Sequence, residues 1–194
     1  MGMADFQSAV AELGLQPHEA LTPGPLTPLL AKGAALHPAA AGELVPGTEG
    51  ILALLRYVGE GGSTYTYNAV LTSIPQSTAF VPRLICERKG RMTDTVHYGF
   101  EIANTKLWTE SVALSERWKI STSPFQDENW MRQLFAPSLI DFIAEHAAAD
   151  FSFELTYGTL LCSVESDDPS SAELVNLWLT AAGIAAAVIK ECAE

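Results

Sequence analysis

The chain has 194 residues, of which 48% are hydrophobic and 18% charged, and its formal net charge is −12. This length suits a domain with a substantial core, and this composition excludes an intrinsically disordered chain. The charge lies mostly in the second half, because residues 98–194 carry fifteen acidic and only five basic side chains. An acidic surface repels phosphate groups, so nucleic acid and anionic membranes are excluded as main partners.

The cysteines and histidines show no pattern typical of metal or disulfide chemistry. Cys86, Cys162 and Cys192 are odd in number and widely spaced, and the four histidines show no zinc-like spacing. We therefore expect reduced thiols, no metal and no cofactor. The N-terminus does not resemble a secretory signal, and residues 174–189, the longest nearly apolar run, are too few to span a membrane. Together these features predict a cytoplasmic protein without membrane insertion.

The N-terminal quarter predicts a short helix followed by an irregular segment. In residues 4–14, Phe6, Val10 and Leu13 recur on one helical face, and Gly14 could end the helix. Six of the eleven prolines lie within residues 17–46, which indicates irregular backbone there. We expect residues 1–48 to form a helix and a proline-rich arm, and residues 49–194 to form a single domain.

From residue 50 the sequence becomes typical of β-structure. Five segments predict strands: residues 51–59, 64–74, 82–89, 95–103 and 117–123. The turn sequence EGGS joins the first two into a hairpin, and the third and fourth are expected to pair around Gly90. Between Ala103 and Ser115 the sequence fits either a loop or a short helix.

Residues 123–150 predict a helix that is broken at a proline. Apolar side chains recur at helical spacing on both sides of Pro137, which should start the second piece because a proline inside a helix removes a hydrogen bond. Ser123 before Pro124 could cap the first piece.

The stretch FSFELTYGTLLCSVE, residues 151–165, predicts a hairpin with Tyr157-Gly158 as its turn. Glycine at the second loop position fits a type I′ turn. In that register Phe153 faces Cys162, and every pair on the same face is apolar. Cys162 is then a core thiol and not a nucleophile, since its neighbours offer neither a base nor a positive charge.

The C-terminal region predicts a long buried helix. Ser170 and Glu173 have the spacing of a capping box, and apolar residues follow around most of the helical circumference. With the preceding elements, this pattern indicates an α+β fold: a mostly antiparallel sheet of about seven strands with helices packed on one face.

The run RWKISTSPFQDENWMRQLFAPSLIDFIAEHAAADFSFELTYGTLLCSVES, residues 117–166, has a familiar order of strand, proline-broken helix and hairpin. With upstream segments, it resembles an uncharacterised, mostly actinobacterial family described as a domain of unknown function. The resemblance covers roughly residues 26–166 and rests on the hydrophobic pattern and a few positions: Gly50, Pro75, Pro82, Pro137 and Gly158. It implies a fold class and no activity, and many members carry a membrane segment that this chain lacks.

Four basic residues lie within nine positions of this acidic chain: Arg83, Arg88, Lys89 and Arg91. Such a cluster is either a solvated hairpin tip or a docking patch for an acidic partner or another copy of the chain. Trp108, in the ambiguous segment, is the tryptophan we expect to be exposed and able to contact a partner.

The sequence shows no catalytic constellation, so the first hypothesis is a non-catalytic module that binds another protein or itself. The alternative is a small-molecule pocket between sheet and helices, lined by Trp130, Phe135 and Phe142. A third hypothesis, less favoured, is an enzyme that uses carboxylates as acid and base, for example Asp127, Glu128 or Asp141. The same carboxylates near helix starts also suit capping.

Overall fold

The computed structural model describes residues 3–19, 27, 35–58, 62–81, 83–88, 112–122, 127–148 and 150–193. The strands are β1 (Gln16–His18), β2 (Ala35–Val45), β3 (Thr48–Val58), β4 (Thr64–Ser73), β5 (Arg83–Arg88), β6 (Trp118–Thr122), β7 (Ser152–Thr156) and β8 (Thr159–Glu165). The helices are α1 (Met3–Glu12), α2 (Val112–Arg117), α3 (Glu128–Leu134), α4 (Pro137–Glu145) and α5 (Ser171–Ala193), with a short 3-10 helix, η3, at Pro75–Ala79.

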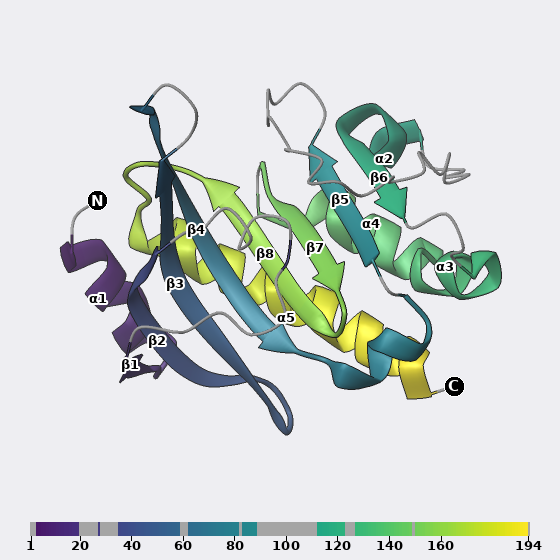
Figure 1. The fold of residues 1–194 in the computed structure, drawn as a ribbon, viewed down its shortest axis with the longest axis horizontal. Helices are drawn as coiled ribbons and strands as arrows, with labels where there is room; N and C mark the ends of the chain where they lie inside the picture. The colour runs from purple at the N-terminus through teal and green to yellow at the C-terminus, as the bar shows by residue number, and fades with distance from the viewer. Residues whose placement is uncertain are drawn as a thin grey trace.

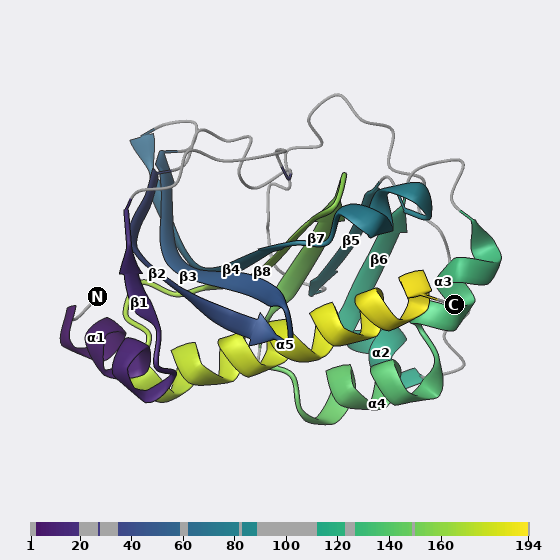
Figure 2. The same cartoon turned by 90° about the horizontal axis from the view of Figure 1, so that it is seen from below.

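The eight strands form one antiparallel sheet in the order β1-β2-β3-β4-β8-β7-β5-β6 (Figure 1). Figure 2 shows α5 running along one side of this sheet, and the five α-helices all bury side chains in the core on that side. The predicted α+β class is confirmed, with eight described strands where about seven were expected.

The proline-rich N-terminal part enters the sheet, so the expectation of irregular backbone is wrong for β1 and β2. Gln16 of β1 pairs with Ala41 of β2, and β2 pairs with β3 along its length. Pro38 lies within a shift of the β2–β3 register between Leu36 and Ala39, where a residue without an N–H is tolerated. The boundary predicted between residues 48 and 49 therefore falls inside the β2–β3 hairpin, at the start of β3.

β5 pairs with two strands that lie far from it in the chain. Its two edges are occupied by β6 and β7, with Cys86 opposite Ile120 on one side and Phe153 on the other. Residues 95–103, the predicted partner, lie outside the described residues. A prediction from local sequence pairs strands that are close together in the chain. The strands that pair with β5 are thirty or more residues away, so the local pattern does not reveal them.

The predicted hairpin of residues 151–165 is confirmed in its register. Phe153 pairs with Cys162, and Tyr157 and Gly158 both have positive φ, at 47° and 80°, as a type I′ turn requires. The broken helix is also confirmed, since Pro137 begins α4. Asp127 caps α3, and Ser123, the expected cap, lies outside the described residues.

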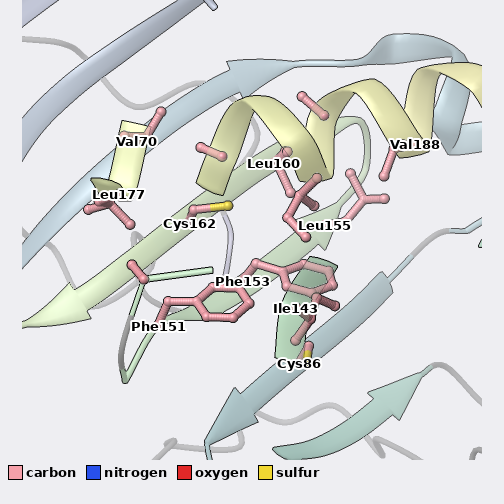
Figure 3. Close-up of a cluster of buried hydrophobic side chains, with 14 of the residues drawn as sticks. Val70, Cys86, Ile143, Phe151, Phe153, Leu155, Leu160, Cys162, Leu177 and Val188 are labelled. Carbon is pink, nitrogen blue, oxygen red and sulfur yellow. The ribbon is translucent and has the colours of Figure 1, made fainter. Parts of the chain in front are cut away.

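One row of paired side chains crosses the whole sheet on the helix-covered face: Pro17, Ala40, Leu52, Val70, Cys162, Phe153, Cys86 and Ile120. All but Pro17 are buried. Figure 3 shows the centre of this row, with Leu177 and Val188 of α5 packed over it. This row and α5 form the core that positions the features described below.

The expectation that the apolar run at residues 174–189 is too short to span a membrane is wrong for the whole helix, because α5 is long and apolar enough to do so by length and composition alone. In this fold it packs against β2, β4 and β8, as a core helix does, and eight of its side chains are buried. α4 also covers it, because a Cβ at Gly183 would lie 2.3 Å from Cζ of Phe142. The cytoplasmic location stays a prediction.

Candidate functional site

The thiols do not form a reactive site. Cys86 and Cys162 are fully buried and flank Phe153 in the row across the sheet (Figure 3). Burial raises the pKa of both thiols far above the ordinary value, and burial with the charge of Glu191 also raises the pKa of Cys192. A thiol without a thiolate fraction is a poor nucleophile, so the interpretation of Cys162 as core is confirmed.

Burial predicts a sharp difference in thiol accessibility. With a disulfide reagent at neutral pH, we expect only Cys192 of the native protein to react readily, because it is partly exposed. Cys86 and Cys162 should react only after unfolding in denaturant, which a spectrophotometric thiol count measures. A Cys192→Ser variant should show no readily reacting thiol, and modification of Cys162 in that folded variant would contradict its burial.

Of the predicted basic patch, only the side chain of Arg83 lies within the described residues. Arg83 is only 8% exposed and lies on the sheet face away from the helices, so it cannot belong to an exposed docking surface. The side chain of Arg88, and Lys89, Arg91 and Trp108, lie outside the described residues. The docking role of those four residues stays a prediction.

The aromatic residues proposed to line a pocket instead fill the core. Trp130 and Phe135 are almost fully buried, and the Trp130 ring stacks on Phe80 with centroids 5.9 Å apart. Phe142 is partly buried against Gly183 of α5. These side chains lie away from the hollow described below.

The carboxylates proposed as acid and base have structural roles or face solvent. Asp127 accepts hydrogen bonds from the backbone N–H groups of Asn129 and Trp130, at 2.8 and 3.2 Å. Glu128 lies 3.7 Å from Arg132, and both are exposed, as is Asp141. Among the described residues, no three metal-binding side chains gather where they could hold an ion.

The sheet face away from the helices carries buried polar residues that sequence reasoning missed: Arg83, Ser121, Glu154, Thr156 and Ser163. They lie on the four neighbouring strands β6, β5, β7 and β8, and an ion pair of 3.4 Å joins Lys119 to Glu87 on the same face. The signal was present, because Arg83 and Glu154 alternate with Leu84 and Leu155 along their strands. Buried polar side chains on neighbouring strands can also stabilise the pairing of those strands. They do not by themselves indicate a ligand-binding site.

A hollow of about 110 Å³ lies beneath the first two turns of α5. It is lined by Asn68, Ala148, Val164, Ser166, Pro169, Glu173, Leu174, Asn176 and Leu177. The buried members form its floor, whereas Glu173 and Asn176 are exposed and form its rim. We call this hollow the α5 pocket.

Asn68 is the unusual residue of the α5 pocket. It lies on β4 between Leu54 and Val164 of the adjacent strands, on the helix-covered face, and is only 3% exposed. Its side chain makes one hydrogen bond within the described residues, from Nδ2 to the carbonyl oxygen of Ser166 at 3.4 Å. Within the described residues no hydrogen bond uses its Oδ1, and Asn68 lines the pocket, so Oδ1 is an acceptor available there.

The wall formed by Ala148 is held in place by Thr180 of α5. The Thr180 hydroxyl accepts a hydrogen bond from the Ala148 N–H at 2.7 Å and donates one to the Asn176 carbonyl oxygen at 2.8 Å. Thr180 is 1% exposed, and its bond with the Ala148 N–H is shielded from water. The pocket is therefore bounded by fixed elements on β4, β8 and α5.

The predicted capping box at the start of α5 is confirmed and forms part of the pocket rim. The Glu173 carboxylate accepts hydrogen bonds from the Ser170 N–H at 2.7 Å and from the Ser170 hydroxyl at 2.8 Å. These two bonds lower the pKa of Glu173, because they favour its charged form.

The lowered pKa of Glu173 predicts a pH dependence of stability. The stabilisation that these two hydrogen bonds give the folded state is complete above the unfolded-state pKa of Glu173, about 4.3. It is lost as pH falls through the lower folded-state pKa of the same group. In urea unfolding from about pH 7 to about pH 3, we expect the free-energy difference between wild type and Glu173→Gln to shrink on acidification. Ser170→Ala should cost about 1 kcal/mol at neutral pH. A difference that grows on acidification would contradict the capping geometry.

Comparison of the chain with family models, curated proteins and solved structures finds no match in any of the three. The resemblance to the actinobacterial family therefore stays a prediction.

Proposed function

We propose that this protein is a small-molecule binding domain and that its ligand occupies the α5 pocket. The single observation that carries the proposal is the placement of Asn68. Its amide is buried in the apolar floor of the pocket, and one of its two polar atoms is available to a ligand. Ligand pockets commonly combine mostly apolar walls with a few polar groups that orient the ligand. Asn68 and the rim residue Asn176 supply that combination here.

The rigid setting of the α5 pocket supports the proposal. Its floor is built from the central strands of the sheet and from the buried side of α5, with Leu174 and Leu177 each 1% exposed. The capping box holds the first turn of α5, and the Thr180 hydrogen bonds hold Ala148. A preformed pocket loses little conformational entropy when a ligand binds.

A pocket-filling substitution tests the proposal. Ala148→Leu places a larger side chain into the α5 pocket, and Ala186→Leu makes the same change on the exposed side of α5 as the matched control. Thermal unfolding is followed with a panel of neutral fragments of about five to seven heavy atoms. We expect fragments that stabilise wild type and Ala186→Leu to lose that effect on Ala148→Leu.

Two outcomes would contradict a ligand in the α5 pocket. One is stabilisation of wild type that persists in Ala148→Leu, since the fragments then bind elsewhere. The other is the absence of any stabilising fragment. Because Ala148→Leu could disturb folding, Val164→Phe serves as a second filling variant, and circular dichroism checks that each variant is folded.

A second candidate function is self-association, favoured by the exposed side of α5. Leu179 is 58% exposed, and no charged residue lies between Glu173 and Lys190. Large apolar side chains exposed on an uncharged surface are typical of contacts between proteins. Light scattering coupled to size exclusion should show a dimer that Leu179→Glu dissociates. A strictly monomeric wild-type protein would remove this candidate.

A further inference from the structure

We propose that the ligand of the α5 pocket is a small neutral molecule that donates a hydrogen bond to Oδ1 of Asn68. This inference rests on the proposed binding function and adds the chemical class of the ligand. It follows from the orientation of the Asn68 amide, the charges around the pocket and its volume.

The orientation of the Asn68 amide is set by Ser166. The group that faces Asn68 is the carbonyl oxygen of Ser166, which only accepts hydrogen bonds, so the atom 3.4 Å from it must be the donor Nδ2. Turning the amide over would place two acceptors against each other. Oδ1 is therefore the atom left for the pocket, and it requires a donor from the ligand. A ligand that donates to Oδ1 replaces the hydrogen bond that water can make there, whereas a ligand without a donor displaces the water and leaves the acceptor unpaired.

The charges around the α5 pocket disfavour an ionic ligand. None of the nine residues that line it is basic, so an anion finds no counter-charge there. The one acidic lining residue, Glu173, already accepts two hydrogen bonds from Ser170 through Oε2. A charged group placed on the apolar floor would lose its hydration without full compensation. These facts favour a neutral ligand.

The volume limits the ligand to a few heavy atoms. The pocket encloses about 110 Å³, somewhat less than the roughly 150 Å³ cavity known to hold a benzene molecule. A five-membered ring is on this scale. Pyrrole and furan are suitable probes, because they are nearly the same in size and shape but only pyrrole carries an N–H donor.

The experiment compares pyrrole and furan on wild type and on Asn68→Leu. Leucine has nearly the shape of asparagine and no acceptor, so the variant should fold. Binding is followed by chemical-shift changes of amide resonances around the pocket. On wild type we expect pyrrole to bind roughly 5-fold more tightly than furan, the ratio that one additional hydrogen bond provides. On Asn68→Leu we expect the ratio to fall to about one.

The results separate this inference from the function on which it rests. If both rings bind wild type with equal affinity, or if Asn68→Leu keeps the preference for pyrrole, the donor requirement is wrong while binding stands. If neither ring shifts the pocket resonances, the binding function and the inference are both wrong. A Val164→Phe variant should abolish the shifts from both rings, and shifts that survive in it would place the rings elsewhere.

Discussion

Replacing Phe153 by alanine is expected to lower the free energy of unfolding by about 3–5 kcal/mol. Phe153 is fully buried at the centre of the sheet, between Cys86 and Cys162, and its ring lies 6.2 Å from that of Phe151 in a stacked arrangement. Its strand is paired with β5 on one side and β8 on the other, so the neighbours cannot collapse into the space without moving the sheet. Urea unfolding followed by circular dichroism measures the loss.

Two further variants make the Phe153 prediction decisive. Phe153→Leu keeps most of the side-chain volume, so it should lower the free energy of unfolding clearly less than Phe153→Ala. It also provides a folded variant to measure if the alanine variant does not fold. Leu179→Ala removes an apolar side chain that is 58% exposed and should change stability by no more than about 0.5 kcal/mol. A cost for Phe153→Ala near that of Leu179→Ala would show that the central row is not the core.

Replacing Gly158 by alanine is expected to cost about 2 kcal/mol or more, the second largest effect. Its φ of +80° is unfavourable for any residue with a Cβ. An added Cβ would also lie 3.0 Å from Cα of Pro75 and 3.2 Å from the carbonyl oxygen of Ile74. These are backbone atoms, and the Gly158 carbonyl oxygen accepts a hydrogen bond from the Ile74 N–H at 2.7 Å, so the two segments cannot easily separate.

Gly47 is the matched control for Gly158. It lies in the β2–β3 turn with a similar φ of +74°, but a Cβ there would meet no atom within 4 Å. Gly47→Ala therefore reports only the backbone strain, about 1–2 kcal/mol, and Gly158→Ala reports strain together with the contact. Equal losses in the same unfolding assay would mean that the β7–β8 turn moves freely away from η3.

The elements that depend on neighbours in the chain were predicted from the sequence. The register that places Phe153 opposite Cys162 follows from a two-residue turn and strict alternation, which leave one pairing that buries the apolar face. The start of α4 at Pro137 and the Ser170–Glu173 cap follow from rules that act within one helical turn. The α+β class follows from the succession of these elements.

The tertiary structure alone decided which distant segments meet. In the tertiary structure β5 lies between β6 and β7, the proline-bearing β2 is part of the sheet, and Arg83 is buried. The α5 pocket has the same origin, because Asn68 meets Ser166 across 98 positions of sequence. Pairing between strands that are distant in sequence depends on the sum of many long-range contacts. That sum cannot be deduced from a local pattern of side chains. For this reason the sequence indicated a core without revealing the amide that faces its pocket.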